Sequence, residues 1–267
     1  MNSLPIGIFD SGIGGLTVLS ELIKQLPNEG TLYLGDTARV PYGAKSKETI
    51  TEYSREIASF LENQGIKLLI VACNTASAFA VETLTKELTI PVIGVIEPGA
   101  RAAVESSKTK RIGVIGTEST IRANAYHDGI KAIDNDIEVF QKACPIFVPL
   151  AEEGWTSNEV TKLTAKRYLT EMTKKDIDVL VLGCTHYPLL KEAVASVMGS
   201  NVSLVCSADA TARKVSKTLI ENNIEVKKED STPIRKFFIT DSKERFERVG
   251  ESFFGSKINA ELVKLGS

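Results

Sequence analysis

The chain has 267 residues, of which 43% are hydrophobic and 25% are charged, as in ordinary globular proteins. Its net charge is −2 and it contains no basic tract, so direct binding to nucleic acid is not expected. No stretch approaches about 18 consecutive apolar residues, so we expect no membrane span. A strand pattern begins at residue 6, which leaves no room for a signal peptide, and we therefore expect a cytoplasmic protein.

Strand and helix patterns alternate along the chain. Strands are predicted at residues 6–9, 31–34, 68–71, 91–95, 112–115, 138–141, 179–182, 202–205 and 236–240, with a further strand-like run at 146–150. Helices are predicted at residues 16–26, 47–64, 77–88, 100–106, 121–133, 160–172, 189–197, 211–222 and 242–254, and an exposed loop at 226–231. This alternation predicts an α/β fold with mainly parallel sheets flanked by helices.

The two halves of the chain resemble each other. Each opens with a strand that contains glycine, and each later has an apolar strand ending in a cysteine, followed by a helix and another strand. We therefore predict two pseudo-symmetric domains, residues 1–97 plus 210–267 and residues 98–209. The tail is assigned to the first domain because a lone strand and helix cannot form a core. The active site is expected in the cleft between the domains.

Two cysteine motifs stand where predicted strands end. Cys73 is followed by Asn74 and Thr75, and Cys184 is followed by Thr185 and His186. Ligands of α/β proteins bind at the carboxyl ends of strands, and a helix N-terminus lowers the pKa of a thiol from about 8.5. The sequence therefore predicts two reactive thiols at one cleft.

The other soft ligands are few. The remaining cysteines are Cys144 and Cys206, and the only other histidine is His127. Cys206 lies at the end of a predicted strand and Cys144 precedes Pro145, and both cysteines are interpreted as packing residues. No C-x-x-C pair occurs, so we expect neither disulfides nor a metal site.

Three further segments carry candidate ligands. Asp10 and Ser11 begin a glycine-rich turn that would attract a carboxylate to a helix N-terminus, although it matches neither the dinucleotide fingerprint nor the P-loop. Tyr42 and Gly43 form a turn after the second strand. Glu152 follows an apolar run and could face the cleft, although such an acidic residue is commonly part of a solvated turn.

Two thiols on opposite walls of a cleft suit a racemisation. One thiolate removes the α-proton of an amino acid and the other thiol delivers a proton to the opposite face. Without a cofactor, the carbanion must be stabilised by preorganised hydrogen bonds in a dry cleft.

The motifs around these residues resemble those of the glutamate racemases, in the aspartate/glutamate racemase superfamily. The similar strings begin at Phe9, Gly35, Pro41, Ala72 and Gly183, and they extend to Val95 and Gly113. The resemblance implies interconversion of L- and D-glutamate without a cofactor or metal, supplying D-glutamate for peptidoglycan. It also implies that Cys73 acts on the D-enantiomer and Cys184 on the L-enantiomer, in a homodimer.

The resemblance also assigns substrate contacts. These are Asp10, Ser11, Tyr42, Gly43, Asn74, Thr75, Thr185 and His186, with Glu152 in a supporting role. Three alternatives stay open: a racemase for aspartate or another small substrate, a thiol redox enzyme, and a non-catalytic partner protein, since some homologues are reported to inhibit DNA gyrase.

Overall fold

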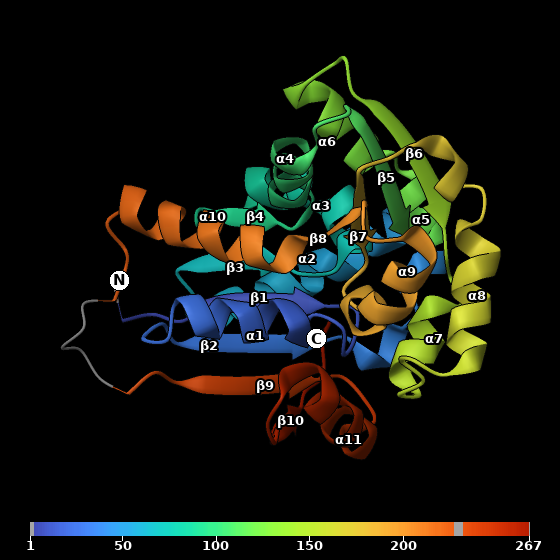
Figure 1. Ribbon diagram of the computed structural model, residues 1–267. Coiled ribbons are helices and arrows are strands. Elements are labelled where there is room, and N and C mark those ends of the chain that lie inside the picture. Colours follow the sequence, from blue (N-terminus) through green and yellow to red (C-terminus); the bar gives the residue numbers. More distant parts are fainter. Residues whose placement is uncertain (1–2, 227–231, 267) are drawn as a thin grey trace.

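The protein consists of two parallel sheets surrounded by helices. Figure 1 shows it as a computed structural model, which describes residues 3–226 and 232–266. The sequence predicts this fold class, and the prediction is confirmed. Part of the predicted loop at 226–231 lies outside the described residues. None of the described helices is long and apolar enough to cross a membrane.

The first sheet has six parallel strands. Their order is β10 (Ala260–Leu262), β9 (Arg235–Ile239), β2 (Thr31–Gly35), β1 (Ile6–Asp10), β3 (Leu68–Val71) and β4 (Val92–Gly94). Two strands from the end of the chain thus extend a sheet that the first hundred residues begin (Figure 1). The exact division of the chain near residues 97 and 210 stays a prediction.

The second sheet has four parallel strands. Their order is β6 (Glu138–Ala143), β5 (Arg111–Gly116), β7 (Val179–Gly183) and β8 (Ser203–Cys206). In both sheets the strand that opens the unit, β1 or β5, pairs with the strand that precedes the cysteine, β3 or β7. This shared order is the structural basis of the repeat seen in the sequence.

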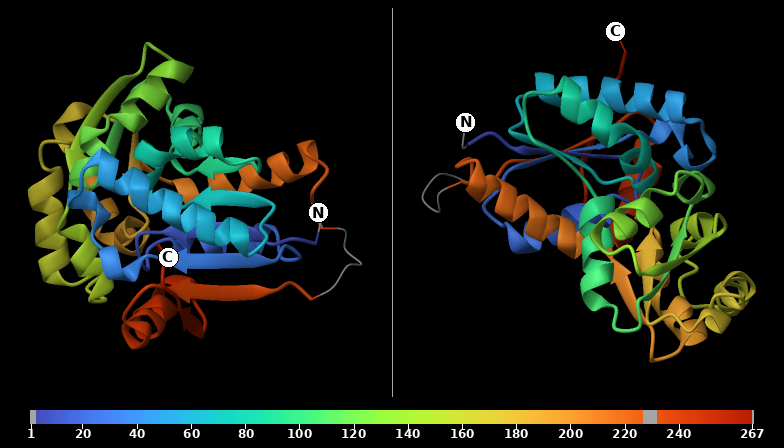
Figure 2. Two further views of the ribbon diagram at one scale, coloured as in Figure 1. Left: turned by 180° about the vertical axis from the view of Figure 1, so that it is seen from behind. Right: turned by 90° about the horizontal axis from the view of Figure 1, so that it is seen from above.

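Helices cover both faces of each sheet. On the first sheet, α1 (Leu16–Gln25), α10 (Ser207–Glu221) and α11 (Lys243–Phe254) pack on one face, and α2 (Lys47–Asn63) and α3 (Asn74–Glu87) on the other. On the second sheet, α4 (Ile96–Ser106) and α6 (Ala125–Ile133) face α7 (Phe147–Glu152), α8 (Glu159–Leu169) and α9 (Lys191–Met198) across the strands (Figure 2). Side-chain alternation produces this layering: Val179 and Val181 pack toward α4 and α6, whereas Leu180 and Leu182 pack toward α7 to α9.

Several helices begin earlier than the sequence predicts. Helix α3 starts at Asn74, α4 at Ile96 and α10 at Ser207. The start of α3 matters for the site, because it places Cys73 directly at the N-terminal end of a helix.

Two predictions about local structure are wrong. The strand-like run at 146–150 is part of helix α7, in which Phe147, Leu150 and Ala151 are buried at helical spacing. A short apolar run does not distinguish a strand from a buried helix. The helix predicted at 121–133 is two helices, α5 (Glu118–Arg122) and α6, separated at Asn124, whose φ is 55°. Strand β10 was not predicted.

Candidate active site

The carboxyl ends of strands from both sheets meet at one cavity. Strand β1 ends at Asp10, and β7 ends just before Cys184. Cys73 lies between β3 and α3. The cavity has a volume of about 260 Å³. Parallel strands commonly deliver ligand-binding groups to such an edge.

The structure brings the predicted site residues together. Those that line the cavity are Ser11, Tyr42, Gly43, Cys73, Asn74, Thr75, Glu152, Cys184, Thr185 and His186. Asp10 is fully buried and does not itself line the cavity. It is adjacent to Ser11 and contacts Thr185, both of which do. Cys144 is buried away from this lining, and Cys206 is partly buried at the end of β8.

Cys73 is a buried thiol with a hydroxyl partner. Its Sγ lies 3.7 Å from Ser11 Oγ, and the side chain is 6% exposed. Burial, with the charge of Asp10 as the second cause, raises the pKa of Cys73 to about 12. The predicted lowering of the pKa by the helix N-terminus is therefore wrong for this thiol, because desolvation outweighs the backbone hydrogen bond at the start of α3.

Cys184 has an imidazole partner instead. Its Sγ lies 3.8 Å from Nδ1 of His186. The His186 ring is buried and packs edge-on against Phe253, with the ring centroids 5.3 Å apart. The two thiols thus occupy equivalent places in the repeat but have different neighbours, a hydroxyl for Cys73 and a basic ring for Cys184.

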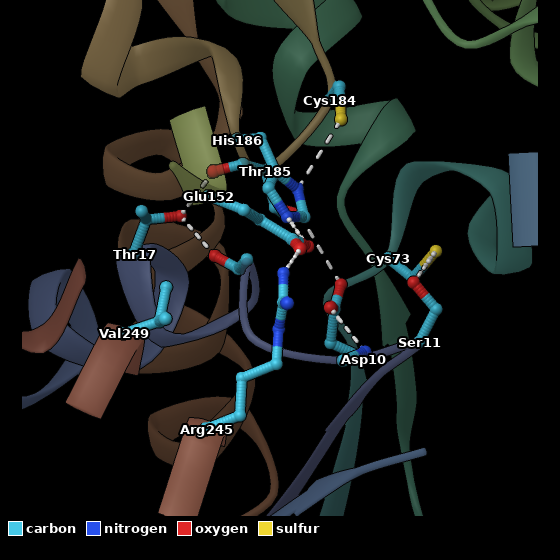
Figure 3. Close-up of polar contacts among 12 residues, drawn as sticks. Asp10, Ser11, Thr17, Cys73, Glu152, Cys184, Thr185, His186, Arg245 and Val249 are labelled. Atoms are coloured by element: carbon cyan, nitrogen blue, oxygen red, sulfur yellow. Dashed lines mark hydrogen bonds and ion pairs between the residues drawn. The ribbon is translucent and has the colours of Figure 1, made fainter. Parts of the chain in front are cut away.

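His186 is held by a carboxylate on its far side. Its Nε2 lies 3.0 Å from Glu152 Oε1 (Figure 3). Burial alone would lower the pKa of His186, but Cys184, Glu152 and the charge of Asp10 outweigh it and raise the pKa to about 10. The raised pKa favours the imidazolium form of His186 at neutral pH.

Glu152 itself is held between two cations. Its second oxygen, Oε2, accepts a hydrogen bond from Arg245 Nη2 at 2.9 Å. Burial would raise the pKa of Glu152, but the contacts with His186 and Arg245 lower it overall. Arg245 was not predicted at this site, because it lies 93 residues away from Glu152 on α11.

Asp10 organises the turn after β1. Its Oδ2 accepts a hydrogen bond from the Gly12 N–H at 2.9 Å, and its Oδ1 accepts one from Thr185 Oγ1 at 3.4 Å. Burial raises the pKa of Asp10, while the charge of His186 opposes that shift. A buried carboxylate at this point offers a counter-ion to a substrate ammonium group.

Asn74 presents a hydrogen-bond donor at the cavity. Its Oδ1 accepts a hydrogen bond from the Tyr126 hydroxyl at 2.7 Å, which orients the amide. Its Nδ2 is buried and has no hydrogen-bond partner among the described residues. Since buried donors are normally paired, an orphaned N–H group at this cavity is suited to an anionic ligand.

Thr75 belongs to a cluster that the sequence did not reveal. Its Oγ1 lies 2.9 Å from Thr117 Oγ1 and 3.1 Å from Thr120 Oγ1. Thr117 directly follows β5 as Ser11 directly follows β1, so the repeat was the signal that could have pointed to it. The cluster joins the two halves of the chain at the cavity.

Tyr42 and Gly43 form one wall of the cavity, in the short helix η2 (Tyr42–Ala44). The Tyr42 hydroxyl donates to buried Asp36, so its proton is not directed at the cavity. Gly43 packs against Thr117, and a Cβ at this position would lie 2.8 Å from the Thr117 Cβ. This wall therefore contributes backbone atoms and shape to the cavity.

No cluster of three or more metal-ligating side chains occurs within residues 3–226 and 232–266. The polar side chains that line the cavity carry two thiols, hydroxyls, one amide, the carboxylates of Glu118 and Glu152, and the imidazole of His186, which is paired with Glu152.

Comparison with known proteins defines the class. Residues 6–215 match the family described as Asp/Glu/Hydantoin racemase, and the chain belongs to this family. It is 56% identical over 253 residues to a glutamate racemase of Geobacter metallireducens, an alignment that covers 95% of this chain and 93% of that one. The resemblance to glutamate racemases is thus confirmed, and the chain is placed among the racemases, which are isomerases.

Solved structures agree with this placement. A glutamate racemase of Bacillus anthracis superposes with a TM-score of 0.95 at 40% identity, covering 99% of this chain and 98% of that one. A glutamate racemase of Francisella tularensis in complex with D-glutamate has a TM-score of 0.93 at 39% identity, again covering 99% and 98%.

Proposed function

We propose that this protein interconverts L- and D-glutamate by transferring protons at the α-carbon between Cys73 and Cys184. The observation that carries the proposal is the meeting of two thiols, from two parallel sheets, at one small cavity. The relatives named as glutamate racemases support the choice of substrate.

The different partners of the thiols suit opposite roles. Cys184, with the imidazolium of His186 beside it, is the group to which we assign removal of the α-proton of L-glutamate. Burial keeps Cys73 as a thiol, which then delivers its proton to the opposite face. In the reverse direction the roles exchange.

Substrate binding favours the reverse direction, in which Cys73 removes the α-proton of D-glutamate. The charge of Asp10 contributes to the raised pKa of Cys73. A substrate ammonium group beside Asp10 offsets that charge and makes the Cys73 thiolate easier to form. The orphaned Asn74 N–H and the hydroxyls of Thr75 and Thr185 are the donors we assign to the substrate carboxylates.

We further propose that the reaction needs no added cofactor or metal, that it takes place in the cytoplasm, and that its D-glutamate serves peptidoglycan synthesis. Assembly as a homodimer belongs to the same proposal. These points follow from the resemblance to the family and from the groups assigned to proton transfer.

The test is an assay in which purified protein, first dialysed against a chelator, is added to glutamate and the circular dichroism of the glutamate is recorded over time. Starting from either L- or D-glutamate, the signal should decay to zero. L-aspartate, tested in parallel, should change far more slowly. Activity that disappears on dialysis and returns with pyridoxal phosphate or a divalent metal would contradict the proposal, as would a preference for aspartate.

A further inference from the structure

Helix α11 reaches the candidate active site from the end of the chain. Figure 3 shows Arg245 extending from this helix to Glu152, which in turn reaches His186. The helix lies beyond residue 215, where the match to the racemase family ends. The match to that family therefore does not include its contact with the site.

We propose that Arg245 is a positioning residue for the racemisation, which acts through Glu152 on His186 and thereby on Cys184. The contacts form a continuous series: Arg245 Nη2 to Glu152 Oε2 at 2.9 Å, Glu152 Oε1 to His186 Nε2 at 3.0 Å, and His186 Nδ1 to Cys184 Sγ at 3.8 Å. The inference rests on the proposed function, in which Cys184 transfers a proton.

Glu152 needs a second anchor because of where it stands. It is the last residue of α7, and its side chain is 23% exposed, so the backbone leaves its carboxylate free to turn toward water. The guanidinium of Arg245 engages one oxygen and thereby directs the other at His186. Phe253, on the same helix, packs against the His186 ring. One helix thus fixes both the ring and its carboxylate partner.

The charged and titratable groups around His186 come from four elements. Asp10 lies at the end of β1, Cys184 follows β7, Glu152 ends α7, and Arg245 stands on α11 behind Glu152. Cys184, Glu152 and Asp10 all raise the pKa of His186 and so favour the imidazolium. Arg245 opposes it, but its side chain is 49% exposed and its repulsion is screened by solvent. The positional effect therefore dominates, and loss of Arg245 weakens the contact between Glu152 and His186.

Kinetics of matched variants test the series. Arg245→Met should lower kcat/KM about tenfold, within the range of coupling energies between residues in contact. Because the equilibrium constant of a racemisation is one, kcat/KM must fall equally in both directions, whereas kcat and KM are free to change differently. Arg245→Lys should restore most of the activity. Arg248→Met, at an exposed arginine of the same helix that makes no ion pair within the described residues, should match the parent enzyme.

A double-mutant cycle separates positioning from simple support of the helix. In a Glu152→Gln background, Arg245→Met should have little further effect, because the series is already interrupted. An undiminished tenfold loss in that background would overturn the proposal.

The chain offers a second readout that does not require activity. It contains only two histidines, so histidine labelled with ¹⁵N gives resonances for His186 and for the partly exposed His127, which serves as the internal reference. The pKa of His186 should be high in the parent, about 10, and lower in Arg245→Met, but unchanged in Arg248→Met. An unchanged or higher pKa in Arg245→Met would overturn the proposal even if the protein proved to act on another substrate.

Discussion

Gly14 lies directly against the ring of His186. A Cβ at position 14 would stand 2.5 Å from His186 Nδ1, the nitrogen that faces Cys184, and would also collide with the Thr185 hydroxyl. The glycine-rich turn after β1 therefore does more than allow a tight bend. It leaves the space in which the groups of the second half of the chain approach the first.

Gly14→Ala should accordingly impair turnover. Displacing His186 and Thr185 by a fraction of an ångström to one ångström should cost roughly 100-fold in kcat/KM. Gly129→Ala is the matched control, because it lies within α6 and its nearest neighbour, the Ala100 Cβ, would be at 3.4 Å. That control should keep full activity and gain about 0.5–1 kcal/mol in free energy of unfolding, measured with urea. A fully active Gly14→Ala enzyme would show that the close approach has no catalytic importance.

The essential thiols can be separated from the packing thiols by substitution. Cys73→Ser and Cys184→Ser should each abolish racemisation, because a hydroxyl is a far weaker acid than a thiol and cannot exchange the α-proton near neutral pH. Cys144→Ser and Cys206→Ser should remain active, although substitution of the buried Cys144 should lower the free energy of unfolding.

A finer readout uses solvent exchange. In deuterated water, each inactive serine variant should still exchange or eliminate the α-proton of one enantiomer of a suitable substrate analogue, because the other thiol remains. Loss of activity in Cys144→Ser, with the fold intact by circular dichroism, would show that the residues after each cysteine are a poor guide to function.

Much of the site could be predicted because its chemistry is local in sequence. Cys73 and Cys184 each follow a buried strand and precede polar residues, so their place at a sheet edge follows from the strand pattern alone. The parallel sheets follow from the alternation of strands and helices for the same reason.

The remaining contacts depend on tertiary approach. Arg245 meets Glu152 only because α11 packs on α1 and the sheet it covers, and Thr117 meets Thr75 only because two sheets share a cleft. No spacing in the sequence predicts the first of these contacts, and the repeat places Thr117 at a strand end without showing that it meets Thr75. Burial also depends on the tertiary structure. The helix start suggested a lowered pKa for Cys73, whereas burial by the surrounding structure raises it.

Asp10→Asn should reduce turnover more than it disturbs folding. An asparagine can still accept from the Gly12 N–H through its oxygen and donate to Thr185 through its nitrogen, so the turn keeps both contacts. It cannot neutralise a substrate ammonium group, and hydrogen bonds to charged groups contribute about 1.5–3 kcal/mol. We expect kcat/KM to fall roughly 10- to 100-fold, with little change in the urea midpoint. Unchanged catalytic efficiency would remove Asp10 from the site.

The buried imidazolium should make stability depend on pH. The pKa of His186 is raised to about 10 in the folded protein, against about 6.5 in an unfolded chain. A raised pKa means that the folded state holds one more proton than the unfolded state between these values. The stabilisation from His186 is therefore fully present below about pH 6.5 and is lost as the pH rises toward 10.

His186→Gln isolates this contribution, because its neighbours that titrate in alkali, including Cys73, remain in place. Free energies of unfolding should be measured with urea at pH 6, 7, 8 and 9 for both proteins. Over this range the parent should lose stability more steeply than His186→Gln, by up to about 1.4 kcal/mol for each pH unit, which corresponds to one proton. The variant should be the less stable protein at pH 6, with the gap closing toward pH 9. Parallel curves would mean that His186 is neutral in the folded protein, and Cys184 would then lack its cationic partner.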